Sequence, residues 1–352
     1  DVCSSDLISF VSTRGRGLNT DLQLVKDNLM AALPEVEFEY YLNKTATKIP
    51  LINTKMEDAR RTFCTEAQNI ICMDPSIPIK IPSASERERR LLLATPFDYQ
   101  FNIFMKYHDN PDQPKKQTFI RCTHVMPGSP FTAKLFHSFY EWEDNVTFLN
   151  DIPLPISWDI LQEEKRTTVK KQLEFYFPQA KGKKILSILL VGQKPEPEDG
   201  SEPVNLFDNF NLKKIMDYID DDWFVITNNW DLVELSYQLS YQYSSKFGYI
   251  KNKISLNDMM YLSDMLITNS SKHAGNFSIT KKPIYYLEYL PKIFGDFIKK
   301  FYPSMYLKDL EQLLTLDFSN TELSPEQKNF CQEFSYDPTE NPSETIEKLF
   351  KY

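Results

Sequence analysis

Short apolar runs alternate with helical patterns along this chain, and the alternation constrains the fold more than any other feature. An apolar run at 7–13 is followed by a glycine-containing loop, a helical pattern that ends near Leu33 and a second extended run at 35–42. Strands buried on both faces of a parallel sheet are near-continuous apolar runs, and a strand, a helix and a strand in succession form a βαβ unit. Similar runs at 69–74 and 90–97 continue the pattern. The chain is therefore predicted to be α/β with parallel sheets.

A second series of strands and helices follows a proline-broken segment. Pro153 and Pro155 are predicted to interrupt regular structure, and a charged helical pattern then runs from about 160 to 176. The second series has predicted strands at 185–191, 223–227 and 265–268 and predicted helices at 210–219 and 256–263. We predict two Rossmann-like domains that face each other across a cleft. Their bounds are 1–155 and 181–325, with a linker and helix at 156–180 and terminal helices at 326–352.

The charge balance limits the partners of the chain. Its 352 residues carry a formal net charge of -9. Binding to a nucleic-acid backbone usually needs a clustered basic face, so nucleic acid is not expected as the main partner. An anionic ligand would have to be held by a local positive pocket.

Cysteine and histidine usage predicts neither a metal site nor a disulfide framework. The five cysteines show no CxxC spacing, and the four histidines form no HxH or HExxH motif. No apolar run approaches the roughly 20 residues that span a bilayer, and no signal peptide opens the sequence. A cytoplasmic protein without a cofactor or structural metal is the expectation. We set Asp1–Leu7 aside as a suspected non-native end, because a common sequencing-adapter end encodes the same heptapeptide.

Polar residues gather where the predicted strand at 265–268 ends. They are Asn269, Ser270, Ser271, Lys272 and His273, and a helical pattern follows. A helix that begins at the end of a strand directs free N–H groups and its positive dipole end outward, which favours phosphate. Two interpretations stay open, a phosphate site and a plain serine cap with a solvated lysine.

Two further loops are predicted at the same sheet edge. Gln193 and Lys194 follow the strand at 185–191, where the lysine could pair with a diphosphate. Thr227 is the last residue of the predicted strand at 223–227 and Asn228 follows it, at a position where a nucleoside could be recognised. A lysine in a polar surface loop and an ordinary asparagine turn are the alternatives.

The first half offers candidates for an acceptor site and a general base. Arg14, Arg16 and Asn19 follow the opening strand, and the arginines could bind an anionic acceptor through paired hydrogen bonds. The spacing is G-x-G and not GxGxxG, so no dinucleotide fingerprint is present. His124 lies at the expected end of a strand and is the best-placed candidate base, against the alternative of a histidine hydrogen-bonded inside a turn.

The stretch SLNDMMYLSDMLITNSSKHAGNFSITKKPIYYLEY, at 255–289, resembles a known donor-domain signature. The family is that of the CDP-glycerol glycerophosphotransferase-like proteins, the bacterial teichoic-acid polymerases and their capsule relatives, with the pattern ADVLITDYSSxxFDFxxLxKPxxFYxxD. The chain keeps DMLIT, Ser271, Phe277 and KKP at that spacing. Three further segments resemble the family. The family's KKxILYAPTWR is matched by KKILSILLVGQK, which places Lys194 where an arginine usually stands. The family's SSPFxxxxF is matched by VMPGSPFTAKLF, and its SERIxxxI is matched by SETIEKLF.

The resemblance covers about the last two-thirds of the chain and implies a GT-B fold. It implies an acceptor site in the first domain, a CDP-linked donor in the second, and terminal helices that cross back onto the first. The sequence departs from the family in having NSSK for DYSS and GNF for FDF, and in lacking the WHGT motif that carries the acceptor-side base.

The resemblance therefore implies a transferase that uses a nucleotide-activated donor and a cell-surface polysaccharide, teichoic-acid-like or lipid-linked acceptor. His124 and Arg16 are the catalytic candidates, with Arg14, Arg16 and Asn19 on the acceptor. A glycosyltransferase with another nucleotide sugar and an inactive GT-B-like binding protein are the alternatives. The aromatic and basic stretch at 281–303 would either contact a membrane surface, on the inner face of the plasma membrane, or belong to the core. The sequence leaves the oligomeric state open.

Overall fold

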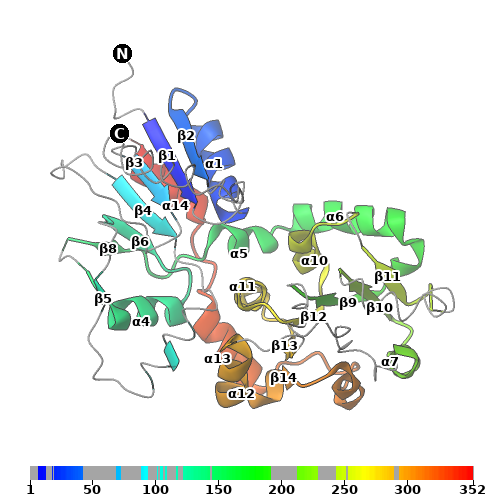
Figure 1. The fold of residues 1–352 in the computed structure, drawn as a ribbon. Helices are drawn as coiled ribbons and strands as arrows, with labels where there is room; N and C mark the ends of the chain where they lie inside the picture. Colours follow the sequence, from blue (N-terminus) through cyan, green and yellow to red (C-terminus); the bar gives the residue numbers. More distant parts are fainter. Residues whose placement is uncertain are drawn as a thin grey trace, which may run out of the picture. The chain divides into compact units, whose positions relative to one another are not determined.

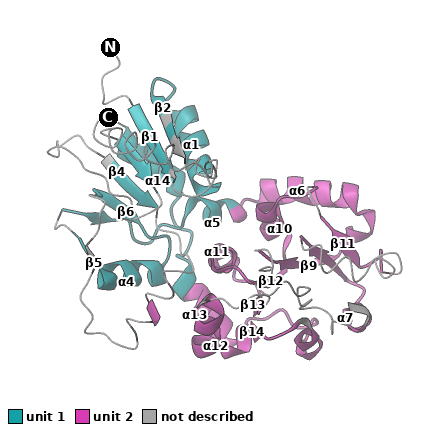
Figure 2. Cartoon of the chain, viewed as in Figure 1, with its two compact units in different colours: residues 1–96, 106–159, 333–352 teal, residues 97–105, 160–332 magenta. Residues whose placement is uncertain are grey.

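The chain divides into two compact units. The computed structural model describes residues 7–12, 18, 20–42, 69–72, 89–93, 101, 104–105, 108, 116–117, 122–142, 145–191, 212–228, 243–250, 253–288 and 293–351. Unit 1 comprises residues 1–96, 106–159 and 333–352, and unit 2 comprises residues 97–105 and 160–332 (Figure 2). Each unit contains one six-stranded sheet, and all strand pairs in both sheets are parallel. The predicted α/β class with two parallel sheets is confirmed.

The sheet of unit 1 has the strand order β2-β1-β3-β4-β6-β8. Its strands are β1 Leu7–Ser12, β2 Glu37–Leu42, β3 Asn69–Cys72, β4 Arg89–Leu93, β6 His124–Met126 and β8 Thr147–Phe148, and β5 Lys116–Gln117 pairs with β7 Tyr140–Glu141 in a small separate sheet. Phe10, Ile71 and Leu91 lie at one level of the central strands and are fully buried. Their apolar side chains explain why these short runs form the centre of the sheet.

Two helices far apart in the sequence pack together in unit 1. They are α1 Thr20–Ala32 and the last helix, α14 Pro342–Phe350 (Figure 1). The Asn28 amide donates a hydrogen bond of 2.7 Å to the Ser343 hydroxyl, and Ile346 and Phe350 are buried. The final helix of the chain therefore belongs to the first sheet's unit.

The segment after β8 is more regular than the sequence predicts. Pro155 opens a short helix, α5 Pro155–Ile160, instead of interrupting regular structure. Proline is tolerated in the first turn of a helix, where its missing N–H would have no partner within the helix. The next N–H, of Ile156, donates to the Asp21 carboxylate at 3.1 Å.

The sheet of unit 2 has the strand order β11-β10-β9-β12-β13-β14. The strands are β9 Lys184–Leu189, β10 Trp223–Thr227, β11 Phe247–Tyr249, β12 Met265–Thr268, β13 Ile284–Leu287 and β14 Tyr306–Leu307. Numbered along the chain within this sheet, the order is 3-2-1-4-5-6. This is the order of a doubly wound dinucleotide-binding fold, which changes direction between its first and fourth strands. In unit 2 these strands are β9 and β12.

Helices complete both units. Among the described residues, unit 1 also contains α4 Pro130–Phe139. Unit 2 contains α6 Glu163–Tyr176, α7 Leu212–Tyr218, α10 Leu256–Leu262, α11 Ser271–Phe277 and α12 Ile293–Phe301, and the division of the chain into units falls within α13 Pro325–Phe334. Short 3-10 turns lie at 178–180, 278–280, 303–305 and 310–315. A capping box starts α10, since the Ser255 hydroxyl accepts from the Asp258 N–H at 3.0 Å and the Asp258 carboxylate accepts from the Ser255 N–H at 3.3 Å.

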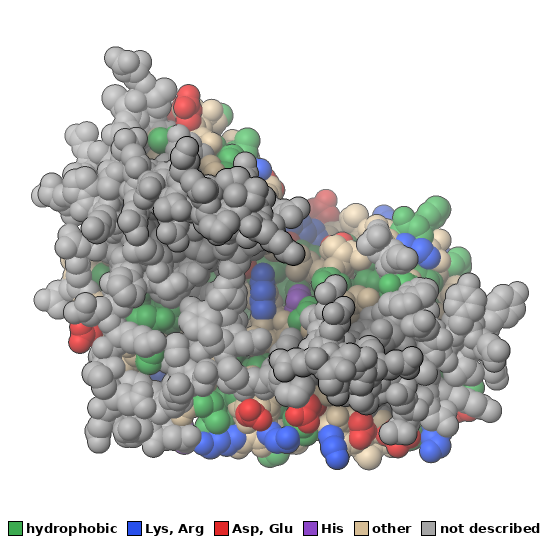
Figure 3. Space-filling model, viewed as in Figure 1, with side chains coloured by type: hydrophobic (Ala, Val, Ile, Leu, Met, Phe, Trp, Pro, Cys, Tyr) green, Lys and Arg blue, Asp and Glu red, His purple; other side chains and the backbone are tan. Residues whose placement is uncertain are grey.

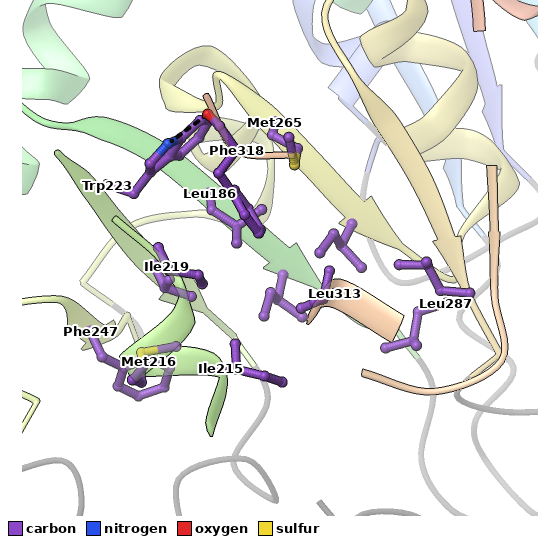
Figure 4. Packing of buried hydrophobic residues seen from close by; sticks show 14 of the residues in the cluster. Leu186, Ile215, Met216, Ile219, Trp223, Phe247, Met265, Leu287, Leu313 and Phe318 are labelled. Atoms are coloured by element: carbon purple, nitrogen blue, oxygen red, sulfur yellow. Dashed lines mark hydrogen bonds between the residues drawn. The ribbon is translucent and has the colours of Figure 1, made fainter. Parts of the chain in front are cut away.

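One face of the second sheet packs on α7 and on the segment near Phe318. Leu186, Trp223 and Met265 converge there with side chains of α7 (Figure 4). The Trp223 indole N–H, which is fully buried, donates to the Phe318 carbonyl at 3.2 Å. Burying apolar side chains of this size contributes roughly 1.5–3 kcal/mol each, and satisfying the indole N–H avoids an unpaired buried donor. α6 and α10 pack on each other, and α10 packs on β9.

The helix α12 within the aromatic stretch at 281–303 buries much of its apolar face. In α12, Phe294, Phe297 and Ile298 are buried, and Phe294 and Phe297 pack on Phe101 with ring centroids 4.7 and 4.9 Å away. These three apolar side chains of α12 are therefore buried, as the core interpretation expects. Within the described residues, no helix has both the length and the apolar content needed to cross a bilayer.

Candidate functional site

The topology of unit 2 selects one sheet edge as the candidate site. In doubly wound sheets, ligands bind outside the carboxyl ends of the strands, where the strand order reverses. In this sheet that position lies at the ends of β9 and β12. Five of the predicted donor-site residues follow β12 directly: Asn269, Ser270, Ser271, Lys272 and His273. Thr227 ends β10, and Asn228 follows it.

Two asparagine side chains at this edge bind the backbone that leaves β9. The Asn228 amide accepts from the Leu190 N–H at 2.9 Å and donates to the Leu190 carbonyl at 2.7 Å. The Asn269 amide accepts from the Val191 N–H at 2.8 Å and donates to the Val191 carbonyl at 2.9 Å. Both amides therefore support the main chain, and the prediction that Asn228 recognises a nucleoside receives no support from this geometry.

The threonines at the strand ends are also bound to the main chain. Thr227 is fully buried, and its hydroxyl donates to the Ile188 carbonyl at 3.0 Å. Thr268 is fully buried, and its hydroxyl accepts from the Ser270 N–H at 3.2 Å. The Thr227 contact joins the end of β10 to β9, and the Thr268 contact fixes the turn between β12 and α11.

The two serines have different positions. Ser270 is the N-cap of α11, and its hydroxyl accepts from the His273 N–H at 3.4 Å. Ser271 is the first residue of the helix and is 4% exposed, while Lys272 and His273 are half-buried. The cap interpretation is therefore correct for Ser270, and it does not account for Ser271.

The charges at this edge suit an anion. Among the described residues that directly follow β9, β10 and β12, up to the end of α11, there is no carboxylate, and Lys272 carries a positive charge. The chain as a whole has a net charge of -9. A strand end whose described residues carry no acid is favourable for a diphosphate. Figure 3 shows the contrast at the lower edge of the molecule, where basic and acidic side chains are interspersed.

A second cationic location lies at the opposite, amino edge of the same sheet. A cavity of about 260 Å³ there is lined by Gly182, Lys183, Lys184, Asp264, Lys281, Lys282, Pro283 and Thr321. Sequence reasoning did not single out this cavity, although the doublets Lys183-Lys184 and Lys281-Lys282 directly before two strands were a visible signal.

The cations of that cavity already have protein partners. Lys282 donates to the Ser263 carbonyl at 2.8 Å and to the Asp264 carboxylate at 3.0 Å, and Arg166 contacts the same carboxylate at 3.1 Å. Burial lowers the pKa of the Lys282 ammonium, and Asp264 opposes part of that change. Lys183 donates to the Ser245 carbonyl at 2.8 Å. We therefore assign the candidate site to the carboxyl edge.

His124 does not occupy its predicted place. It is the first residue of β6, not the last of a strand, and it pairs with Leu91 in the middle of β4. Its ring Nδ1 lies 2.8 Å from the Thr123 hydroxyl oxygen. The location prediction is wrong because the strand runs from His124 to Met126 and does not end at the histidine. A role as general base stays a prediction, and a position below the carboxyl edge does not favour it.

The residues that follow β6 reach the carboxyl edge of the first sheet instead. They form the turn at Gly128 and the start of α4, where the Ser129 hydroxyl accepts from the Thr132 N–H at 3.2 Å. The predicted residues Arg14, Arg16, Asn19, Gln193 and Lys194 lie outside the described residues. In the described part of the chain, no three His, Cys, Asp or Glu side chains gather in a way that could hold a metal ion.

Comparison with known proteins identifies the fold. No model of a known protein family matches the chain, and no curated protein matches it. A solved variant of the wall teichoic acid polymerase TagF matches 98% of this chain and 88% of that chain, with a TM-score of 0.62 and 12% identity. The same coverage is found for a TagF variant soaked with CDPG, with a TM-score of 0.62 and 13% identity, and for TagF itself, with a TM-score of 0.59 and 12% identity. The predicted resemblance to the teichoic-acid polymerases and the GT-B-like fold are confirmed by this structural match, which at such identity establishes the fold alone.

Proposed function

We propose that this protein is a transferase that moves a glycerophosphate, polyol-phosphate or sugar unit from a nucleotide-activated donor, CDP-linked in the first instance. The acceptor is a cell-surface polysaccharide or a teichoic-acid-like or lipid-linked precursor. The observation that carries the proposal is the acid-free end of β12 at the reversal point of a 3-2-1-4-5-6 sheet. The shared fold with TagF over 98% of the chain supports it.

In this proposal the donor diphosphate binds where β12 passes into α11. Ser271 would donate a hydroxyl hydrogen bond, and Lys272 and His273 would add charge. Gln193 and Lys194 follow β9 in the sequence, and we assign them to the same ligand. Fixed donors at the diphosphate stabilise the charge that develops on the leaving phosphate.

The reaction replaces one oxygen substituent on the transferred group by another. For a glycerophosphate donor, an acceptor hydroxyl oxygen bonds to the phosphorus, the bond to the nucleoside monophosphate oxygen breaks, and the hydroxyl proton passes to a base. For a sugar donor, the new bond forms at the anomeric carbon and a nucleoside diphosphate leaves. Arg14 and Arg16 would hold an anionic acceptor, with Asn19 beside them in the sequence. The base is assigned to His124 only as a hypothesis to be tested.

A catalytically inactive binding protein of the same fold is the second candidate. It is favoured by the place of His124 at the start of β6 and by the missing WHGT motif. This second candidate would bind a glycan or a protein partner and would show no turnover of a nucleotide-activated donor. We place the protein in the cytoplasm, where nucleotide-activated donors are made. In α12, Phe294, Phe297 and Ile298 are buried and therefore not available for membrane contact.

A calorimetric titration with CDP, CMP, UDP, GDP and ADP tests the proposal. Wild-type protein is compared with Ser271→Ala and Lys194→Ala, and Lys348→Ala, an exposed lysine of α14 in unit 1, is the matched control. We expect one nucleotide to bind, both site variants to bind it about tenfold more weakly, and the control to bind normally. Absence of binding by every nucleotide, or equal affinity in all four proteins, would refute the site. Release of CMP from CDP-glycerol in the presence of an acceptor then separates the transferase from the inactive protein.

A further inference from the structure

The chain runs on past Leu189, the last residue of β9, at the reversal point of the second sheet. β10 ends at Thr227 and pairs Thr227 with Ile188, and β12 ends at Thr268 and pairs Thr268 with Leu189. Leu190 and Val191 therefore have no residue of a neighbouring strand opposite them. Their main-chain groups still carry strand-like hydrogen bonds, which come from the Asn228 and Asn269 side chains.

The hydrogen bonds follow the alternation of a parallel strand. The Lys184 N–H donates to the carbonyl of Asp222, which precedes β10, and the Ile185 carbonyl accepts from the N–H of Asp264, which precedes β12. The main-chain N–H and carbonyl groups of even-numbered residues of β9 thus point to β10, and those of odd-numbered residues point to β12. Leu190 is even and binds Asn228 beyond β10, and Val191 is odd and binds Asn269 beyond β12.

An asparagine side chain can replace a peptide group in this role because it has the same carbonyl and N–H groups. Each amide supplies one donor and one acceptor to a single residue after β9, Leu190 or Val191. Two residues at about 3.3 Å each extend the strand by roughly 7 Å. The extension ends next to Asn269, and Asn269 directly precedes the cap of α11.

We propose that Asn228 and Asn269 are positioning residues of the donor site. They hold Leu190 and Val191 as an extension of β9 that forms one wall beside the start of α11, and they do so without adding a carboxylate next to a diphosphate. The proposal rests on the proposed function. It assigns the two amides to the support of the main chain and not to direct contact with the ligand.

The experiment replaces each asparagine separately by leucine, which is neutral, similar in volume and unable to form either hydrogen bond. Asn228→Ala and Asn269→Ala are used where the leucine variant does not fold. Ser263→Ala is the matched control, because it removes a buried hydrogen bond of 2.6 Å between Ser263, which lies before the start of β12, and Ser187 in the middle of β9. Hydrogen exchange at 188–191 and affinity for the nucleotide that binds wild-type protein are measured for every variant.

We expect the asparagine variants to exchange faster at 188–191 and to bind nucleotide on the order of tenfold more weakly, well below their unfolding temperature. The control should lose stability and keep its affinity. Unchanged exchange, unchanged affinity, or the same loss of affinity in Ser263→Ala would each overturn the positioning role. If wild-type protein binds no nucleotide, the proposed function fails and the positioning role fails with it. If wild-type protein and the asparagine variants bind nucleotide equally well, only the positioning role fails.

Discussion

Gly128 occupies a turn that no other residue fits without strain. It has a φ of +69°, and a Cβ atom at this position would lie 2.3 Å from Leu154 Cγ and 2.9 Å from its Cδ2. Leu154 is 3% exposed and has little room to move. Gly182 is a matched position, because its φ is +76° and a Cβ atom there would meet nothing within 4 Å. The pair separates the cost of the backbone angle from the cost of the overlap.

The expected losses follow from these two terms. Alanine in the left-handed region costs about 1 kcal/mol, which we expect for Gly182→Ala. Gly128→Ala adds overlap with a packed side chain, which typically costs about 1–3 kcal/mol. The total for Gly128→Ala is therefore about 2–4 kcal/mol. The turn starts α4, so the loss should be felt in β6 and α4 of unit 1.

Local hydrogen exchange is the suitable assay, because a chain of two units need not unfold in one step. The free energy of opening is measured for peptides from β6 in Gly128→Ala and from β9 in Gly182→Ala, each against wild type. A second variant, Gly128→Ala with Leu154→Ala, should lose less than the sum of its two single changes, because the overlap is removed. A loss in Gly128→Ala no larger than in Gly182→Ala, or strict additivity in the double variant, would refute the steric reasoning.

Three further changes test individual contacts. The Lys246 ammonium donates to the carbonyls of Ile219 at 2.8 Å and Met216 at 3.3 Å, where α7 ends. Lys246→Met should therefore lower the free energy of unfolding, measured in urea, by about 1–2 kcal/mol. An unchanged free energy of unfolding would show that these contacts contribute nothing. The Lys246 hydrogen bond lowers the pKa of Asp221, so Asp221 adds stability above its unfolded pKa of 3.8 that is lost as pH falls through the lower folded value. Asp221→Asn should therefore have a lower melting temperature than wild type at neutral pH and the same melting temperature in acid. A difference in melting temperature that stays constant with pH would contradict this. Ser270→Ala should cost about 1 kcal/mol in thermal unfolding through loss of the α11 cap, with an unchanged melting temperature as the contrary result.

The strands and caps were predictable because their signals are local. The apolar runs that became β3, β4, β10 and β12 are short, bounded and buried, and the Ser255 and Asp258 capping box lies within four residues. The Pro155 helix was missed because proline is compatible with both a break and a first helical turn.

The sheet edge that these polar residues share was predictable from the sequence, and the hydrogen-bond partners of the individual side chains were not. Polar residues after consecutive strands indicate a shared sheet edge, which is a consequence of parallel topology. The partners of Asn228 and Asn269 lie 38 and 78 residues away in the sequence, and no local pattern links them. An asparagine that binds a ligand and one that binds a distant main chain have the same sequence signal. His124 was misplaced for a related reason, since periodicity does not fix where a three-residue strand begins.

The central claim, that the carboxyl edge of the second sheet binds the donor nucleotide, is tested most directly by mapping where the nucleotide protects the chain. Hydrogen exchange is followed in wild-type protein with and without saturating nucleotide, with peptides that cover 188–195, 268–276 and the amino-edge segments 181–185 and 279–283. We predict slower exchange at 188–195 and 268–276 and no change in the amino-edge segments. Protection at the amino edge, or none at either edge while calorimetry reports binding, would contradict the claim.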